Sequence, residues 1–175
     1  MKNQKSRLEV EAGINNCLLI SDSHTSDLTS LTKHALDFLE QQLANQDMRR
    51  VLIVSDIDGD ELVCDMFYKN LQDVCRSESV DEVVFLGNEL YSRHCGLDPQ
   101  SPENKTIAGQ ARNDTDKIKK YFFKTTEEFL SSNTLNSFKN QAILLKIAPE
   151  FSPEKVKMYL QLLPHDTVLE INFDA

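Results

Sequence analysis

Four short runs of consecutive apolar residues constrain the fold of this chain more than any other feature of its sequence. They are NCLLIS at 16–21, RVLIVS at 50–55, EVVFL at 82–86 and QAILLK at 141–146. Apolar runs of this length that do not alternate with polar residues are typical of strands buried on both faces, as in parallel sheets covered by helices. The segments between the runs are therefore expected to supply those helices.

Helical spacing does occur between the apolar runs. Apolar residues recur at intervals of three and four from Leu28 to Leu43, and again at Val63, Met66, Phe67, Leu71 and Val74. Each pattern predicts an amphipathic helix that covers the sheet. A short helical turn is expected at 89–92.

Two later helices have clear start signals. In the predicted helix 125–132, Thr125 is the expected cap and Glu128 completes a capping box. The last helix is predicted to open on Ser152 and Pro153, a capping residue followed by a proline in the first turn.

Strands that alternate with helices predict a Rossmann-like α/β domain, namely a doubly wound, mostly parallel sheet of about six strands with helices on both faces. Shorter strands expected at 7–11, 121–123 and 167–172 add to the four apolar runs. A chain of 175 residues suits one such domain. Because folds of this class bind ligands at the carboxyl ends of their strands, the candidate ligand-binding segments follow the apolar runs. These segments are 21–27, 56–61, 87–89 and 146–150.

Composition excludes several classes of function. The formal charge of −9 and the isoelectric point near 4.9 argue against a nucleic-acid-binding protein, which needs a basic stripe for the phosphates. No apolar run reaches the roughly 20 residues of a membrane span, and the first seven residues lack the apolar core of a secretory signal. The four cysteines have no paired C-x-x-C spacing and the histidines are scattered, so no metal site is expected. We expect a cytoplasmic protein that binds neither membranes nor nucleic acids.

Residues 93–116 interrupt the alternation of strands and helices. They hold Gly96, Pro99, Pro102 and Gly109 and show neither helical nor strand periodicity. The string RHCGLDPQSPENKTIAGQARNDT resembles the translated product of a palindromic repeat element inserted into a bacterial gene. We predict a disordered insert at an exposed loop tip, where added length is tolerated; an active-site lid is the alternative interpretation.

One strand end resembles the first motif of the haloacid-dehalogenase-type phosphatases. In VLIVSDIDGDEL, an apolar strand is followed by Asp56, Asp58 and Gly59. Asp56 would attack phosphorus, Asp58 would act as acid and base, and both would help to place Mg²⁺. The later acidic pair that completes such a metal site is missing, and Asp60 stands in place of the usual threonine. A magnesium-dependent phosphatase remains the alternative enzyme, and a non-catalytic interaction module is a further alternative.

Taken in order, the strand ends resemble the carboxy-terminal domain of the Mur ligases, and most closely that of the UDP-N-acetylmuramoyl-tripeptide:D-alanyl-D-alanine ligases. Arg7 precedes the first core strand, as the hinge arginine of that family does. The family string D-S-Y-N-A-N-P-x-S is matched by D-S-H-T-S-D-L-T-S at 22–30, which keeps the aspartate and both serines. The matches at the next three strand ends are S-D-I at 55–57 for G-D-M, G-N-E at 87–89 for G-x-E and K-I-A-P at 146–149 for K-G-S-R.

The resemblance implies specific roles for six residues. Arg7, Asp22, Ser23 and His24 would lie at the nucleotide, with Asp22 on the ribose and Arg7 at the hinge, whereas Asp56 and Lys146 would line the substrate side. In an intact ligase this domain closes over ATP and Mg²⁺ held by a central ATP-binding domain, and its substrates are a UDP-muramoyl peptide and D-Ala-D-Ala. The departures at His24 and after it, and at 147–149, imply degenerate nucleotide-contacting motifs and no catalytic residue in this chain.

The last residues carry a second resemblance. The string H-D-T-V-L-E-I-N-F-D-A at 165–175 is similar to the opening strand of alanine racemases, T-x-L-E-I-N-L-D-A-L. Some bacteria fuse a Mur-ligase-like region to alanine racemase. The resemblance implies a ligase-like domain over 1–164 followed by the beginning of a racemase segment, with pyridoxal phosphate bound only by the racemase beyond residue 175. The partners expected for the chain are thus the central domain and the racemase domain of its own polypeptide, and the chain alone is expected to be inactive.

Overall fold

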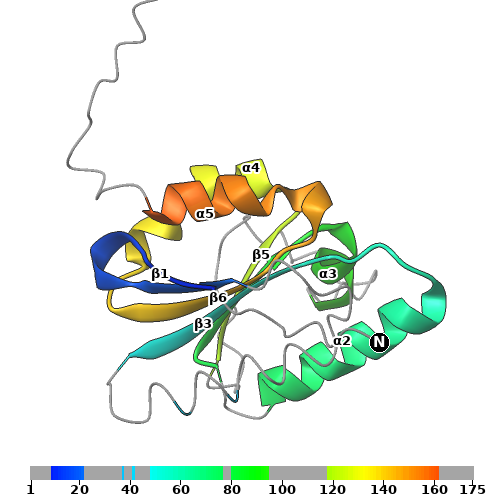
Figure 1. The fold of residues 1–175 in the computed structure, drawn as a ribbon. Coiled ribbons are helices and arrows are strands. Elements are labelled where there is room, and N and C mark those ends of the chain that lie inside the picture. The colour runs from blue at the N-terminus through cyan, green and yellow to red at the C-terminus, as the bar shows by residue number, and fades with distance from the viewer. Residues whose placement is uncertain are drawn as a thin grey trace, which may run out of the picture.

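The structure, a computed structural model, describes residues 9–21, 37, 41, 48–76, 80–94 and 118–161. Its centre is a six-stranded sheet with the order β1-β2-β6-β3-β4-β5 (Figure 1). The edge strand β1 runs antiparallel to β2, and all other neighbouring strands are parallel. The expected α/β fold with a mostly parallel sheet of about six strands is confirmed.

The strands are β1 (Glu9–Ala12), β2 (Leu18–Ser21), β3 (Arg49–Ser55), β4 (Glu82–Leu86), β5 (Lys119–Phe123) and β6 (Gln141–Lys146). The helices are α2 (Glu61–Arg76), α3 (Asn88–His94), α4 (Thr126–Ser131) and α5 (Pro153–Gln161). Short 3-10 turns occupy η1 (Ile14–Asn16), η2 (Leu135–Ser137) and η3 (Pro149–Phe151).

The sheet separates two apolar cores. Because side chains alternate along a strand, Leu52 and Val54 of β3 face one core while Val51 and Ile53 face the other. Helices α2 and α3 close the first core, and α4 and α5 close the second; α2 and α5 lie on opposite sides of the sheet in Figure 1. Burial on both faces explains why β3, β4 and β6 read as continuous apolar runs.

Most element bounds agree with the sequence patterns. β4 and β6 match the predicted runs at both ends, and β3 begins one residue earlier than predicted. The predicted helix 28–43 lies outside the described residues except for Asp37 and Gln41, which are helical. The predicted strand 167–172 and the segment 165–175 also lie outside the described residues.

The boundary of the predicted insert needs a correction. Helix α3 continues to His94, so residues 93 and 94 are helical rather than part of an irregular segment. Leu90, in the first turn of α3, is fully buried in the core that α2 and α3 cover. Its burial anchors the helix to the sheet and allows the helix to continue past residue 92. The remainder of the segment, 95–116, lies outside the described residues.

The cap of α4 follows the prediction in one half only. The Thr125 hydroxyl accepts a hydrogen bond from the Glu128 amide at 3.2 Å, as expected. The Glu128 carboxylate accepts from the amide of Lys124 at 2.8 Å, whereas a capping box would place this bond on Thr125. The start of α4 is therefore fixed by two side chains, with one bond displaced by a residue.

Strand β1 is tied to helix α5 by charged side chains. The Lys157 ammonium lies 2.7 Å from Glu11 Oε2 and 3.6 Å from a carboxylate oxygen of Glu9. The side-chain amide of Gln161 donates to the same Glu11 oxygen at 3.1 Å. Glu9 and Glu11 are two positions apart on the strand and thus share a face, which lets one lysine reach both.

Within the described ranges, none of the helices is long and apolar enough to cross a membrane.

Candidate functional site

The carboxyl ends of the parallel strands meet at one edge of the sheet, which we term the carboxyl edge. Ser21 of β2 is paired with Leu145, and Val54 of β3 is paired with Lys146 of the central strand β6. The ladder extends past the strand ends, since the Asp56 amide donates to the Leu86 carbonyl at 2.8 Å. This edge is the position at which the fold class predicts a ligand.

Asp56 fixes the first turn of α3 against the end of β3. Its Oδ2 accepts a hydrogen bond from the Glu89 amide at 2.9 Å, and its Oδ1 accepts from the Leu90 amide at 2.8 Å. A carboxylate that satisfies the free amides at a helix start acts as a cap, here supplied from a different strand. The consequence is that Glu89 is held at the carboxyl edge by Asp56.

Two further residues complete this arrangement around Asp56. The hydroxyl of Tyr68, which is buried on α2, donates to Asp56 Oδ1 at 3.3 Å. Burial, together with the nearby Asp56 carboxylate, raises the pKa of Tyr68, so the phenol stays a donor across the physiological range. Gly87 has φ +126°, and a side chain there would overlap the Asp56 carboxylate.

Ser55 joins the end of β3 to the segment after β6. Its side chain is fully buried; its hydroxyl donates to the Asp56 carbonyl at 2.9 Å and accepts from the Ala148 amide at 2.7 Å. The segment K-I-A-P, which starts at Lys146, is thereby held beside Asp56. Lys146 is only 3% exposed at the end of the central strand.

Comparison with known proteins supports the fold. No protein-family model matches the sequence, and no curated protein matches it significantly by sequence. Solved structures do match in fold, and three of them illustrate the likeness. The chain superposes on a domain from a UDP-N-acetylmuramate:L-alanyl-γ-D-glutamyl-meso-diaminopimelate ligase of Haemophilus ducreyi. The TM-score is 0.52 and the identity 16%, over 88% of this chain and 99% of that domain.

The other two matches are to longer proteins. MurF from Acinetobacter baumannii gives a TM-score of 0.54 and 20% identity over 91% of this chain, and the murein peptide ligase Mpl from Psychrobacter arcticus gives 0.51 and 13% over 89%. The chain has the fold of a Mur ligase domain. It spans 31% of the MurF chain and 30% of the Mpl chain, so in those two proteins this fold is one part of a larger polypeptide.

Two of the six site residues predicted from the Mur ligase resemblance lie in the described chain. The structure places both, Asp56 and Lys146, at the carboxyl edge. Arg7, Asp22 and Ser23 lie outside the described residues, as does His24. The described chain does include Ser21, the residue before Asp22. Ser21 is paired with Leu145, the residue before Lys146.

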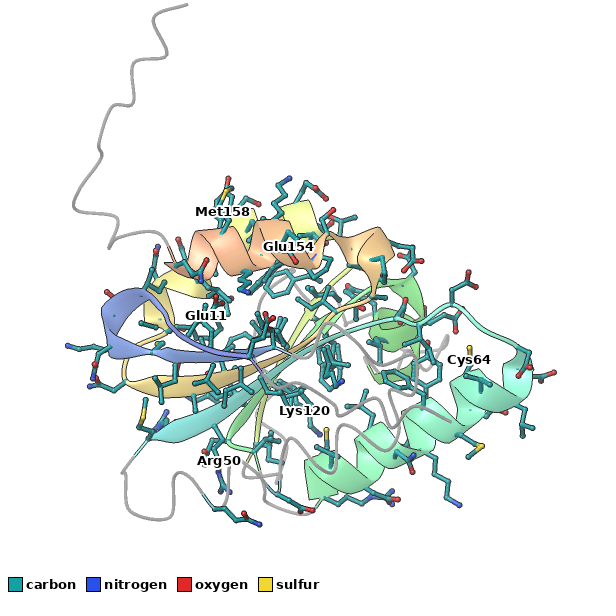
Figure 2. The ribbon with its side chains drawn as sticks, viewed as in Figure 1. Glu11, Arg50, Cys64, Lys120, Glu154 and Met158 are labelled. Carbon is teal, nitrogen blue, oxygen red and sulfur yellow. The ribbon has the colours of Figure 1, made fainter. Side chains whose placement is uncertain are left out.

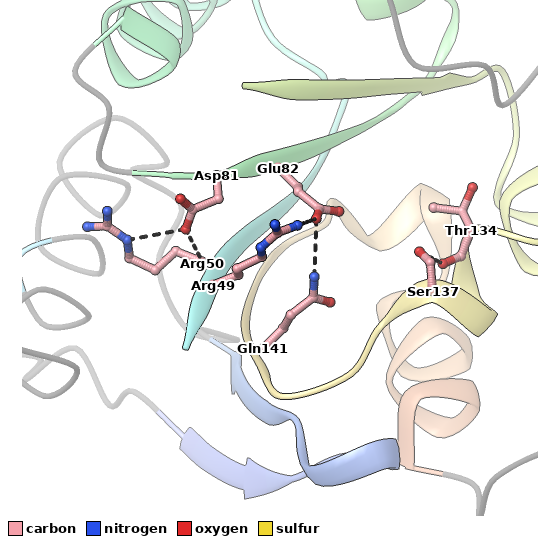
Figure 3. A network of polar contacts seen from close by, with 7 residues as sticks. All are labelled: Arg49, Arg50, Asp81, Glu82, Thr134, Ser137 and Gln141. Carbon is pink, nitrogen blue, oxygen red and sulfur yellow. Dashed lines mark hydrogen bonds and ion pairs between the residues drawn. The ribbon is translucent and has the colours of Figure 1, made fainter. Parts of the chain in front are cut away.

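The opposite edge of this Mur ligase fold carries a polar cluster of its own (Figure 3). Buried Glu82 accepts hydrogen bonds at 3.3 Å from Arg49 and at 3.3 Å from the side-chain amide of Gln141, which joins β4, β3 and β6. Asp81 accepts from the backbone amide of Arg50 at 2.7 Å. These contacts join the starts of neighbouring strands and fix their register, and nothing in their sequence positions had pointed to them.

The phosphatase interpretation of Asp56 and Asp58 finds little geometric support. Both oxygens of Asp56 accept backbone amides, so the carboxylate serves as the cap of α3 rather than standing free toward a phosphate substrate. Asp58 is exposed on the loop that leads to α2. Among the described residues, no group of three or more His, Cys, Asp or Glu side chains is placed to hold a metal ion.

Sequence reasoning missed Tyr68 and the hydroxyl of Ser55. Tyr68 follows Phe67 on α2. It can be recognised as buried only when the face of the helix that packs on the sheet is known. The predicted apolar face of α2 contained Val63 and Met66, but these are 45% and 52% exposed while Tyr68 is 4% exposed. A serine at the end of an otherwise apolar strand is the signal that identifies Ser55.

Proposed function

We propose that this chain is an accessory domain of a peptidoglycan-precursor ligase of the Mur type, and that its carboxyl edge faces the nucleotide and the incoming substrate. The observation that carries the proposal is the fold match over 88% to 91% of the chain to three such ligases or ligase domains. The convergence of Asp56, Lys146 and the end of β2 on one edge supports it. It also agrees with the position expected for ligands in doubly wound sheets.

The ligase activity that we propose is that of a UDP-N-acetylmuramoyl-tripeptide:D-alanyl-D-alanine ligase. A central ATP-binding domain would hold ATP and Mg²⁺, and this domain would close over them. Asp22 would contact the ribose with Ser23 and His24 beside it, and Arg7 would act at the hinge. The basis for these roles is the string D-S-H-T-S-D-L-T-S after β2 and the family pattern that it resembles.

The structure suggests how the two substrate-side residues would act. Asp56 is engaged with the first turn of α3, so it would act on the substrate side by positioning Glu89 rather than through an open carboxylate. Lys146 would supply positive charge next to the segment that Ser55 holds in place. Neither residue is proposed to be catalytic.

We further propose that the polypeptide continues into an alanine racemase, as the string at 165–175 suggests, and that the isolated chain is inactive. The sequence has no G-x-x-x-x-G-K-[ST] phosphate-binding loop of its own. The lysine that would bind pyridoxal phosphate would belong to the racemase part. The chain would thus serve the ligase and racemase parts as an accessory domain.

Ligand titration followed by nuclear magnetic resonance tests the proposal. UDP-N-acetylmuramoyl-tripeptide, D-Ala-D-Ala and magnesium ATP are added separately to the chain, and the amide shifts of Glu89 and Ala148 are compared with those of Glu82 at the opposite edge. We expect shifts at the carboxyl edge alone, with a dissociation constant for ATP weaker than about 100 μM, which corresponds to about 5.5 kcal/mol. Shifts confined to the opposite edge, or no shift with any of the three ligands, would contradict the proposal.

Two activity assays test the remaining claims. The chain with added pyridoxal phosphate is expected not to convert L-alanine to D-alanine. It is also expected not to hydrolyse p-nitrophenyl phosphate with Mg²⁺, because the Asp56 carboxylate is engaged in capping α3. Phosphate release that is lost in both Asp56→Asn and Asp58→Asn would establish the phosphatase alternative instead.

A further inference from the structure

Three neighbouring apolar side chains at the start of α2 are exposed. Leu62 is 71% exposed, Val63 is 45% exposed and Met66 is 52% exposed. On a helix, positions three and four apart are neighbours, so Met66 adjoins both of the others and the three form one patch, which we term the α2 patch. Single exposed apolar residues are common on protein surfaces, whereas a contiguous group marks a candidate contact surface.

The α2 patch lies next to the carboxyl edge. Helix α2 begins directly after the loop that follows Asp56, and the Asp60 carboxylate caps the helix by accepting from the Val63 amide at 2.9 Å. Figure 2 labels Cys64, which lies within this stretch at the start of α2. A body that covered the patch would therefore also lie beside the ends of β3 and β4.

The surroundings of the α2 patch are acidic. The exposed residues interspersed with it include four carboxylates, namely Asp58, Asp60, Glu61 and Asp65. The lysine at position 69 is the one basic residue in the stretch 56–75. A surface that buried this patch would have to bring positive charge to its rim, since like charges at an interface oppose association.

We propose that the α2 patch docks a second domain of the same polypeptide, one whose apolar contact surface is rimmed by lysine or arginine. This inference rests on the proposed function, in which the chain is one domain of a larger ligase. A second copy of the chain is disfavoured as the occupant, because pairing the α2 patches of two copies would place four carboxylates opposite four identical carboxylates.

The size of the patch also favours a covalently linked occupant. A stable complex between separate proteins buries roughly 800 Å² on each partner, and three side chains supply only a fraction of that. A linker raises the effective concentration of a second domain to the order of millimolar, at which a small patch is sufficient for docking. In MurF and Mpl, the residues outside the matched fold make up the larger part of the same chain.

Hydrogen exchange on the 175-residue chain and on the complete product of its gene tests the inference. We expect amide exchange across 61–67 to be at least tenfold slower in the complete polypeptide. The double variant Leu62→Ser/Met66→Ser, made in the complete polypeptide, should abolish that difference. Because both side chains are exposed, this variant should melt within about 2 °C of the parent. Met158→Ser is the matched control, since Met158 is 51% exposed on α5 on the opposite side of the sheet (Figure 2).

The charge component is tested separately in the same polypeptide. Asp58→Asn/Asp65→Asn should reduce the protection of 61–67, whereas Asp73→Asn, at the far end of the same helix, should leave it unchanged; Asp60 is kept because it caps α2. Equal exchange in the two polypeptides, or a gene product no longer than this chain, would overturn the proposal. Protection that rises with protein concentration would also overturn it, in favour of a second copy. Absence of ligand-induced shifts at the carboxyl edge would contradict the proposed function. The hydrogen-exchange difference would still decide whether the α2 patch docks a second domain.

Discussion

Replacing Gly87 by alanine is expected to damage both the fold and the carboxyl edge, because this glycine is required for two separate reasons. Its φ of +126° lies in a region that side-chain-bearing residues rarely adopt. In addition, a methyl group there would overlap Oδ2 and Cγ of Asp56 and come within 2.9 Å of its Cβ. Asp56 cannot move aside without leaving the amides of Glu89 and Leu90.

The magnitude follows from these two contributions. A residue forced into a sparsely populated backbone region costs about 1–3 kcal/mol. Loss of one hydrogen bond to the Asp56 carboxylate adds about 1.5–3 kcal/mol. We therefore expect Gly87→Ala to lower the free energy of unfolding by about 2.5–6 kcal/mol. The melting temperature should fall by about 5 °C or more, given about 2–4 °C per kcal/mol for a domain of this size.

Urea and thermal unfolding, followed by circular dichroism, measure this effect. Gly59→Ala is the matched control, because Gly59 is exposed and its added methyl would meet Val63 at 3.2 Å, a contact on the helix surface. Since the overlap disappears when the carboxylate is removed, Gly87→Ala and Asp56→Ala should be less than additive by about 1 kcal/mol or more. A Gly87→Ala variant that melts within 2 °C of the parent, or a fully additive pair, would refute the reasoning.

Three further predictions concern other parts of the fold. Glu82→Ala should lower the free energy of unfolding, measured by urea denaturation, by about 2–4 kcal/mol, because the buried side-chain amide of Gln141 loses its acceptor. A loss below about 1 kcal/mol would contradict the role assigned to that cluster. Ser55→Ala should cost about 1–3 kcal/mol in the same assay, because the backbone amide bonded to its hydroxyl is left buried without an acceptor, and a neutral result would show that this bond is dispensable. The hydrogen bond to Glu11 raises the pKa of Lys157, so its stabilisation is complete below the ordinary lysine pKa and is lost as the pH rises through the raised value. The gap in stability between the parent and Lys157→Met should thus close only as the pH rises from the ordinary lysine pKa through the raised one, and a gap that widened there would reverse the sign of the argument.

The core of the fold could be predicted because its elements carry strong local signals. β4 and β6 are buried on both faces, and all of their residues are apolar except Glu82, Gln141 and Lys146 at the strand ends, so their bounds follow from the sequence alone. The buried face of α2 could not be predicted in the same way. Val63, Met66 and Phe67 have equivalent spacing, and only the tertiary contacts show that Phe67 and Tyr68 face the core.

The candidate site was predictable in its position but not in its contacts. The rule for doubly wound sheets placed Asp56 and Lys146 at one edge, and the structure confirms that placement. It did not indicate that Asp56 caps α3, because the helix start and the carboxylate are about thirty residues apart and meet only through the β3–β4 pairing. Contacts between distant segments depend on register, which local patterns do not encode.

The bonds from Lys157 and Gln161 to Glu11 have a mechanical consequence. They connect the first strand of the described chain directly to its last helix, on the outer side of the sheet. A force applied between the segments that flank residues 9 and 161 would be transmitted through these side chains and the β1–β2 pair. The parallel strands β3, β4 and β6 would bear little of that force. The part of the fold that holds Asp56 and Lys146 would thus carry little strain when the segments before residue 9 and after residue 161 are pulled apart.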